Sequence, residues 1–298
     1  MTWTSEQIGD QSGRTFLITG GSSGIGLEAA RALAGAGARV VIAVRNRAKG
    51  EQAAGGIGGA VEVAELDLAD LASVRAFAER WDEPVDVLID NAGVMAVPFG
   101  RTADGFELQF GTNHLGHFAL TNLLLPRVTD RVVVVSSGAH RMSDGLDLSD
   151  LNWEHRRYRR WAAYGQSKLA NLLFVLELER RLVGVNSSIR ALAAHPGFAA
   201  TNLQNHSGHP RLDRAAMAVT KLIAQSAEAG AWPTLMAATA DLPGGSYVGP
   251  SGRGESRGVP TLVGRSQQAS DVELAQKLWT ASEELTGVRF PAEVLSGL

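Results

Sequence analysis

The sequence predicts an α/β protein built on a doubly wound parallel sheet of about seven strands, with helices on both faces. Two observations carry this prediction. Short continuous apolar runs, such as residues 39–44, are typical of parallel strands that are covered on both faces. Helical patterns alternate with these runs from residue 14 to residue 193, which indicates successive β-α-β units. No linker or composition break interrupts the chain, so we expect residues 1–298 to form one domain.

The individual elements follow from apolar periodicity and from turn residues. The predicted strands are 14–19, 39–44, 61–66, 85–89, 131–136 and 188–193, with a short one at 247–248. The predicted helices are 27–35, 48–54, 70–80, 105–126, 162–182, 214–240 (in two segments) and 271–285. Segments that follow the sixth strand are well placed to wall a crevice at the carboxyl ends of the strands. We therefore expect a substrate-side lid at residues 202–258.

Composition excludes several classes of function. The chain has 298 residues, 45% of them apolar, and no Cys, so it has neither disulfides nor thiol chemistry. A net charge of −3 gives no electrostatic reason to expect nucleic acid as a partner. No apolar run is long enough to span a bilayer, and the polar start does not resemble a signal peptide. We expect a cytoplasmic protein without a membrane span.

A glycine-rich segment, residues 20–26, lies between the first strand and the first helix. Unpaired backbone N–H groups at a helix start bind phosphate well, and glycines permit a sharp turn and close backbone approach. The segment therefore predicts a site for the pyrophosphate of a dinucleotide. Its candidate binding residues are Gly20, Ser22, Ser23, Gly24, Ile25 and Gly26.

The residue that ends the second strand indicates which nicotinamide cofactor fits. An acid there would accept hydrogen bonds from the adenosine ribose, whereas a phosphorylated ribose needs a cation. This strand ends in Val44-Arg45 without an acid, and a guanidinium matches phosphate geometry. Arg45 therefore favours NADP(H) over NAD(H). Asp67 and Leu68 after the third strand, and Asn91, Ala92 and Gly93 after the fourth, are further candidates for the cofactor pocket.

Tyr164 and Lys168 are four residues apart in a strongly helical segment, so they lie on one helix face. A phenol normally titrates near pH ~10, and a neighbouring ammonium lowers the phenol pKa. The pair is therefore a candidate general acid/base, although such a pair taken alone more often means a half-buried ring beside a solvated charge. Ser136 and Ser137 end the fifth strand at the same sheet edge as the glycine segment. Asn113 is an unfavourable residue inside a helix, where it is either solvated or holds a water through a local distortion.

These features occur in the order that is typical of the short-chain dehydrogenase/reductase family, whose Rossmann-type sheet the chain is expected to share. The sequence resembles that family over most of residues 14–290, and in particular its retinol-dehydrogenase-like branch and bacterial relatives. The matching features are T-G-x-x-x-G-I-G from Thr19, Asn91-Ala92-Gly93, Asn113, Ser137, Tyr164-x-x-x-Lys168 and Pro196-Gly197-x-x-x-Thr201. Thr112-Asn113-His114-Leu115-Gly116-His117-Phe118 supports the branch.

The resemblance implies a role for each matching residue. Tyr164 transfers the proton, Ser137 holds the substrate oxygen in preference to Ser136, and Lys168 binds the nicotinamide ribose and lowers the Tyr164 pKa. Asn113 anchors a water that links Lys168 to solvent. Thr201 and the backbone near Pro196 and Gly197 hold the carboxamide. The implied reaction interconverts an alcohol and an aldehyde or ketone on a small to medium apolar substrate. Helices 105–126 and 162–182 pair subunits in many members, which allows a homodimer or homotetramer.

Two alternatives remain open: a catalytically silent NADP-binding sensor or scaffold, and a sugar-nucleotide epimerase or dehydratase. The four catalytic candidates argue against the first. The absence of a G-x-x-G-x-x-G loop argues against the second. The arginine-rich run at 156–160 is expected to be solvated surface. His114 and His117 are expected to be structural and no metal is expected, because no third ligand accompanies the two imidazoles. Tyr158 lacks a lysine partner four residues on, so Tyr164 is the better candidate.

Overall fold

Alternating burial along the strands divides the hydrophobic core into two layers. In β1 (Thr15–Thr19), Leu17 belongs to one layer while Phe16 and Ile18 belong to the other, and all three side chains are fully buried. Because both faces of the sheet are covered, the sequences of its strands are continuous apolar runs rather than alternating apolar and polar residues. The structure, a computed structural model, describes residues 3–143, 145–198 and 225–295.

The sheet of the described residues has eight strands in the order β3-β2-β1-β4-β5-β6-β7-β8. The other strands are β2 (Arg39–Val44), β3 (Val61–Glu65), β4 (Val85–Asp90), β5 (Val128–Val135), β6 (Arg190–Ala194), β7 (Tyr247–Pro250) and β8 (Pro260–Leu262). All neighbours are parallel except β7 and β8. The order reverses between β1 and β4, the kind of switch point where ligands bind in open α/β sheets.

The expected fold class is confirmed, but the expected count of about seven strands was one too few. β8 has only three residues, begins with Pro260 and forms the antiparallel edge of the sheet. An edge strand this short is too brief for an alternating pattern, and its proline is tolerated because an edge strand needs fewer backbone donors.

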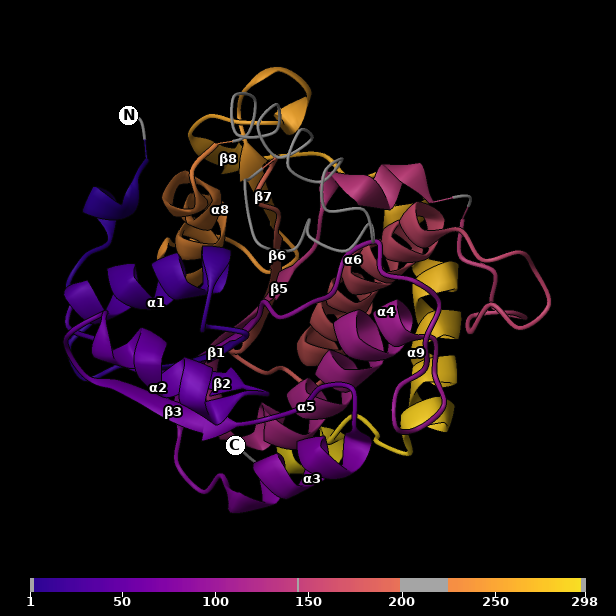
Figure 1. Cartoon of the computed structure of the whole chain (residues 1–298), viewed down its shortest axis with the longest axis horizontal. Helices are drawn as coiled ribbons and strands as arrows, with labels where there is room; N and C mark the ends of the chain where they lie inside the picture. The colour runs from indigo at the N-terminus through magenta and orange to yellow at the C-terminus, as the bar shows by residue number, and fades with distance from the viewer. Residues whose placement is uncertain (1–2, 144, 199–224, 296–298) are drawn as a thin grey trace.

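Helices cover both faces of the sheet. They are α1 (Gly24–Gly35), α2 (Arg47–Gly55), α3 (Leu71–Arg80), α4 (Leu108–Phe110), α5 (Gly116–Leu124), α6 (Arg160–Gly184), α8 (Ala227–Thr239), α9 (Val272–Thr286) and α10 (Ala292–Leu295). One core layer includes α1 and α8, and the other includes α3, α5, α6 and α9 (Figure 1). No helix in the described ranges combines the length and the apolar character needed to cross a membrane.

One predicted segment differs from what is observed, and another lies partly outside the described residues. The helix expected at 105–126 is interrupted between α4 and α5 by a π-helical turn at Gly111–Leu115. Of the expected lid at 202–258, residues 202–224 lie outside the described part of the chain. The described remainder forms α8, β7 and the turns around them.

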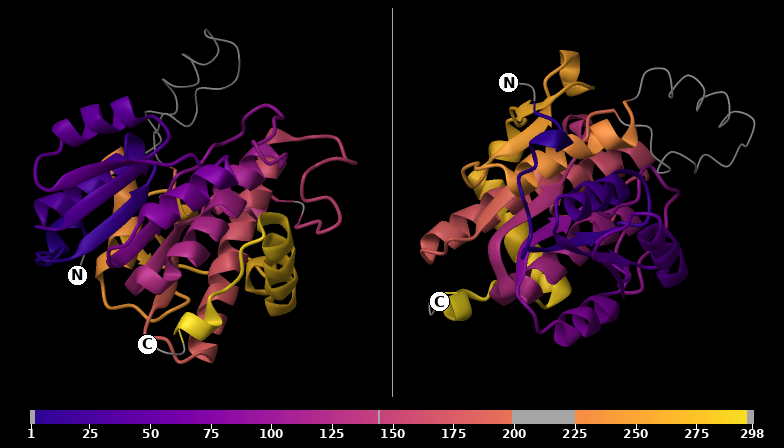
Figure 2. Two further views of the ribbon diagram at one scale, coloured as in Figure 1. Left: turned by 90° about the horizontal axis from the view of Figure 1, so that it is seen from below. Right: turned by 90° about the vertical axis from the view of Figure 1, so that its left-hand side faces the viewer.

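The helix α9 packs its apolar face against α5 and α6 (Figure 2). Trp279 is 1% exposed, and its ring centroid lies 4.9 Å from that of Phe118 and 5.6 Å from that of Phe174. The guanidinium of Arg181 lies over the Trp279 ring at 4.5 Å. Helix α9 is therefore part of the hydrophobic core rather than a surface addition.

We predict that Trp279→Ala lowers the free energy of unfolding by about 3–5 kcal/mol, because it removes a large buried ring and leaves a cavity. Urea denaturation measures the change. Val272→Ala on the same helix is the control, since Val272 is 46% exposed and exposed substitutions usually stay within about 0.5 kcal/mol. Equal effects of the two substitutions would contradict the assigned packing.

Candidate active site

The glycine segment forms a tight turn between β1 and α1. Gly20 has a φ of 72°, and a Cβ there would lie 2.9 Å from the Cα of Ala92. A Cβ on Gly26 would lie 2.5 Å from Asn91 Nδ2. Helix α1 begins at Gly24, three residues earlier than expected, and the side chain of its N-cap residue Ser23 makes no capping hydrogen bond. The first-turn N–H groups are therefore left for an anion.

A cavity of about 420 Å³ opens at this end of the sheet, a volume within the usual range for ligand pockets. Most predicted residues line it: Gly20, Ser22, Ser23, Gly24, Ile25, Gly26, Arg45, Asp67, Leu68, Asn91, Ala92, Gly93, Tyr164, Lys168 and Pro196. Asn113, Ser137 and Gly197 do not line this cavity. Thr201 lies outside the described residues.

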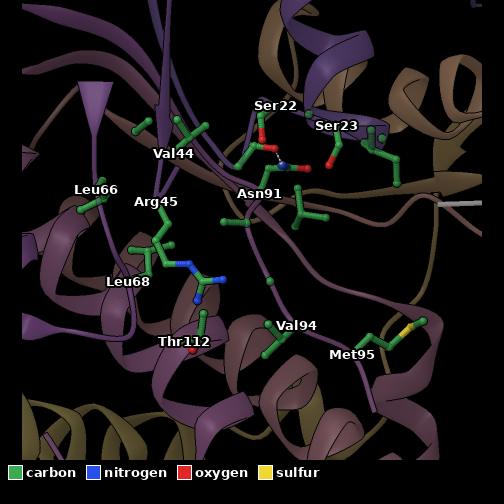
Figure 3. A pocket seen from close by; sticks show the side chains of 18 of the residues that line it. Ser22, Ser23, Val44, Arg45, Leu66, Leu68, Asn91, Val94, Met95 and Thr112 are labelled. Carbon is green, nitrogen blue, oxygen red and sulfur yellow. Dashed lines mark hydrogen bonds between the residues drawn. The ribbon is translucent and has the colours of Figure 1, made fainter. Parts of the chain in front are cut away.

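At one end of the cavity Arg45 extends between Leu68 and Thr112 (Figure 3). Among the described residues no carboxylate pairs with Arg45, whereas its neighbour Arg47 binds Glu51 at 2.8 Å. Lys49 also lines the cavity. Sequence reasoning missed Lys49, although its position in the first turn of α2 was a usable signal. The cavity lining therefore includes two cationic side chains, Arg45 and Lys49, besides the carboxylate of Asp67.

The other end of the cavity holds Tyr164 and Lys168, both from α6 and exposed by only 7% and 4%. Lys168 Nζ donates to the carbonyl oxygen of Val135 at 2.9 Å, and it lies 5.9 Å from the centroid of the Tyr164 ring. Burial lowers the pKa of Lys168 to about 8. Burial also raises the pKa of Tyr164 to about 12, while a hydrogen bond with Ser137 acts in the opposite direction. Desolvation thus outweighs the expected lowering of the Tyr164 pKa.

The two serines after β5 have different environments. The hydroxyl of Ser136 is buried and donates to the carbonyl oxygen of Lys168 at 2.8 Å. The Ser137 side chain accepts from the N–H of Ala139 at 3.1 Å, and it acts to lower the pKa of Tyr164. Ser137 is half-buried, so it is the more accessible of the two serines.

Asn113 lies in the π-helical turn, which is the local distortion that its unfavourable helical position suggested. Its side chain is fully buried, accepts from the N–H of Val94 at 2.8 Å and donates to the Val94 carbonyl at 2.9 Å. It also donates to Ser167 Oγ at 2.9 Å. A Cβ on Gly93 would lie 3.0 Å from Asn113 Oδ1 and 3.7 Å from Lys168 Nζ. The side chains of Asn113 and Lys168 therefore both approach the backbone of Gly93.

Gln109 is a second anchor for the loop after β4, and sequence reasoning missed it. Gln109 is fully buried one helical turn before Asn113, and its Oε1 accepts from the N–H of Ala96 at 2.7 Å. Ala96 has a φ of 49°, an uncommon conformation for a residue with a Cβ. Gln109 also donates to the hydroxyl of Tyr158 at 2.8 Å. Tyr158 is thus a structural phenol, and the anchored loop presents Met95 to the cavity (Figure 3).

The two histidines near Asn113 connect buried elements. His117 binds Thr19 Oγ1 at 2.9 Å and the Asn113 carbonyl at 3.0 Å. His114 binds Ser282 Oγ in α9 at 2.9 Å. Burial lowers the pKa of His117 to about 4 and that of His114 to about 3. Both imidazoles are therefore neutral at physiological pH, and their hydrogen bonds connect buried elements of the fold.

The arginine run at 156–160 is not uniformly solvated. The guanidinium of Arg156 lies 3.8 Å from the centroid of the Trp153 ring and contacts Asp150. It also donates to Gln166 of α6. Arg157 and Arg160 are exposed, as expected. Arg156 therefore joins the long segment before α6 to the helix that carries Tyr164.

Comparison of this chain with known proteins identifies the family to which it belongs. The family model described as short chain dehydrogenase matches residues 14–147. Human retinol dehydrogenase 13 is 40% identical over 94% of this chain and 86% of its own length. An oxidoreductase of Streptomyces lividans is 45% identical over 66% of this chain and 68% of its own length. The crystal structure of an uncharacterised protein from Mycobacterium paratuberculosis is 52% identical, has a TM-score of 0.85, and is matched over 98% of this chain and 100% of that one.

Both the motif order and the sheet agree with these matches. The match to human retinol dehydrogenase 13 covers 94% of this chain and so extends well beyond the glycine segment. The chain belongs to the short-chain dehydrogenase/reductase family of oxidoreductases.

Proposed function

We propose that the protein is an NADP(H)-dependent oxidoreductase that interconverts an alcohol and a carbonyl on a small to medium apolar substrate. The observation that supports this most is a single cavity with a glycine turn at one side and Tyr164 and Lys168 at the other. Ser137 is close enough to this phenol for its side chain to act on the Tyr164 pKa, which it lowers. A hydroxyl donor, a second hydroxyl and a buried ammonium together suit proton transfer to a developing alkoxide.

The residues present fit a dinucleotide. Gly20 and Gly26 let the turn pack closely against Ala92 and Asn91, and the first turn of α1 offers uncapped N–H groups. Arg45 and Lys49 would hold the adenosine 2′-phosphate. Asp67 and Leu68 would line the adenine site, and Asn91, Ala92, Gly93, Pro196, Gly197 and Thr201 would complete the cofactor pocket. When bound, the nicotinamide supplies or accepts the hydride.

The proton chemistry belongs to Tyr164. Burial raises its pKa to about 12, so the phenol is protonated at neutral pH and is a ready donor to a carbonyl oxygen. Ser137 holds that oxygen. Lys168 binds the nicotinamide ribose and, when charged, stabilises the phenolate left after transfer. Asn113 anchors the water that returns a proton through Lys168. This protonation favours carbonyl reduction over alcohol oxidation near pH 7.

The substrate end is walled by apolar side chains of the loop after β4. Val94, Met95 and Val97 line the cavity there (Figure 3), which supports an apolar substrate. We also propose that residues 202–258 wall this side. Within that range Gln225 Nε2 donates to the Pro196 carbonyl at 2.6 Å, which ties the described part of the region to the cavity edge.

We propose that any subunit pairing uses faces that α9 leaves open. Helices α5 and α6 are the ones through which family resemblance suggests a homodimer or homotetramer. Part of their outer surface already packs against Trp279 of α9.

Replacement of the proton donor tests the mechanism. We expect Tyr164→Phe to lower kcat by at least about 10²-fold, because general acid catalysis contributes about 10²–10⁴-fold. NADPH oxidation is followed with short- and long-chain aliphatic aldehydes, benzaldehyde, acetophenone and retinal. Tyr158→Phe is the matched control, since the Tyr158 hydroxyl accepts a hydrogen bond from Gln109 and Tyr158 does not line the cavity. Unchanged turnover in Tyr164→Phe would reject the mechanism, and binding of NADPH without turnover of any carbonyl by the wild type would favour a sensor.

The cofactor preference has its own test. We expect Arg45→Ala to weaken NADPH binding about tenfold or more, the typical cost of a lost charged hydrogen bond, and to leave NADH binding nearly unchanged. Calorimetric titration measures both affinities. Arg47→Ala serves as the control because Arg47 pairs with Glu51. Equal weakening of NADPH and NADH binding in Arg45→Ala would contradict the assignment of Arg45 to the 2′-phosphate.

The buried ammonium predicts a stability gain when it is removed. The pKa of Lys168 is depressed from 10.5 to about 8. The buried charge therefore lowers the free energy of unfolding below pH 8, and this cost disappears above pH 10.5, where the amine is neutral in both the folded and the unfolded state. We expect Lys168→Met to raise the free energy of unfolding at pH 7 by up to about 3 kcal/mol, and this gain should shrink as the pH rises.

Urea denaturation between neutral and alkaline pH measures this gain in the cofactor-free protein. The Val135 carbonyl keeps a donor in the variant, because Asn171 Nδ2 lies 3.2 Å away. Lys277→Met is the control and should change little, since Lys277 is exposed. A destabilised Lys168→Met at pH 7 would contradict the assigned cost of burial.

A further inference from the structure

We propose that His140 is a positioning residue that holds Ser137 beside Tyr164 by donating a hydrogen bond from its Nδ1 to the Ser137 carbonyl oxygen. This inference rests on the proposed function, in which Ser137 binds the substrate oxygen. Nothing in the motif order points to His140. The assignment comes from its contacts alone.

The contacts begin at the catalytic serine. Ser137 precedes a 3-10 turn at Gly138–Met142, and its backbone carbonyl lies 2.7 Å from Nδ1 of His140. The same carbonyl accepts from the His140 backbone N–H at 3.0 Å. His140 is 1% exposed. The imidazole therefore contacts the serine backbone directly and away from solvent.

The second ring nitrogen points to a distant part of the chain. The N–H of Ser266 donates to His140 Nε2 at 3.3 Å. Because a carbonyl can only accept and this N–H can only donate, the ring must be neutral with its proton on Nδ1. Burial lowers the pKa of His140, which agrees with a neutral ring. Both nitrogens are thus used, one on each side of the ring.

The turn that carries Ser137 is also held from the side of Tyr164. A Cβ on Gly165 would lie 2.8 Å from the Ala139 carbonyl oxygen and 3.0 Å from the Ser143 nitrogen. The residue after Tyr164 must therefore be glycine for α6 and the turn to approach this closely. Arg141 adds a hydrogen bond to the Gly264 carbonyl at 2.6 Å.

These contacts make the position of Ser137 depend on His140. Gly165 sets how closely the turn approaches α6, whereas His140 sets where the Ser137 backbone lies along it. If the imidazole is lost, the Ser137 carbonyl loses its side-chain donor and the turn can shift. A shift of the serine by a fraction of an ångström is enough to misplace its hydroxyl relative to Tyr164.

A double-mutant cycle separates positioning from general stability. The variants are His140→Leu, Ser137→Ala and the pair together, assayed with NADPH and the carbonyl of the above panel that has the highest kcat. We expect His140→Leu to lower kcat about tenfold or more when Ser137 is present, and by less than about twofold when Ser137 is already Ala. The KM for NADPH should stay within about twofold in all variants.

A conservative variant tests the contact itself. The amide of His140→Asn can donate from nearly the position of Nδ1 but cannot reach the Ser266 N–H. We expect it to keep kcat within about threefold of the wild type, whereas His140→Leu does not. This comparison also decides the case if Ser137→Ala has no measurable turnover. If His140→Leu does not fold, the Asn variant decides alone, and a tenfold or greater loss of kcat in it would overturn the proposal. Equal losses in the Asn and Leu variants would overturn the proposal.

The outcomes distinguish this inference from the proposed function. If Tyr164→Phe and Ser137→Ala both keep full turnover, the proposed function fails. If those variants lose activity but His140→Leu costs the same factor in both Ser137 backgrounds, only the positioning role fails. A His140→Leu variant with wild-type kcat would also reject the role.

Discussion

Three buried hydrogen bonds join α6 to the end of β5, and the geometry of the site depends on them. Lys168 Nζ and Asn171 Nδ2 both donate to the Val135 carbonyl, and the Ser136 hydroxyl donates to the Lys168 carbonyl. Lys168 keeps its place although burial disfavours its charge. Because Tyr164 lies one turn before Lys168 and Ser137 follows directly after Ser136, this connection brings the two hydroxyls together. Burial at a cost in stability is typical of functional side chains.

The loops around the cavity are held by buried polar side chains rather than by regular backbone pairing. The loop after β4 is bound at Val94 by Asn113 and at Ala96 by Gln109, which lie one turn apart on the same interrupted helix. Thr19 accepts from the N–H groups of Asn91 and Ala92. Backbone groups of this half-buried loop need partners, and these side chains supply them. The walls of the cavity are consequently defined before any ligand binds.

Local patterns made much of this predictable. The apolar runs, the glycine segment and the spacing of Tyr164 and Lys168 depend on near neighbours in sequence, and the structure brings the glycine segment and this pair to one cavity. Gln109, His140 and Trp279 were missed. Each makes contacts with residues far away in the sequence, so no short pattern distinguishes it from an ordinary helix or turn residue. β8 was missed because three edge residues carry no periodicity.

The sequence by itself determined the fold class, the order of the motifs and which phenol has a lysine partner, since these follow from residue type and spacing. Only the tertiary structure decided how that phenol titrates. A lysine four residues away suggests a lowered pKa for Tyr164, but the pKa rises to about 12 because the ring is buried. Tertiary packing likewise decided that Ser136 is engaged with Lys168 while Ser137 meets the phenol. Desolvation and long-range contacts depend on the whole fold, and no local spacing encodes them.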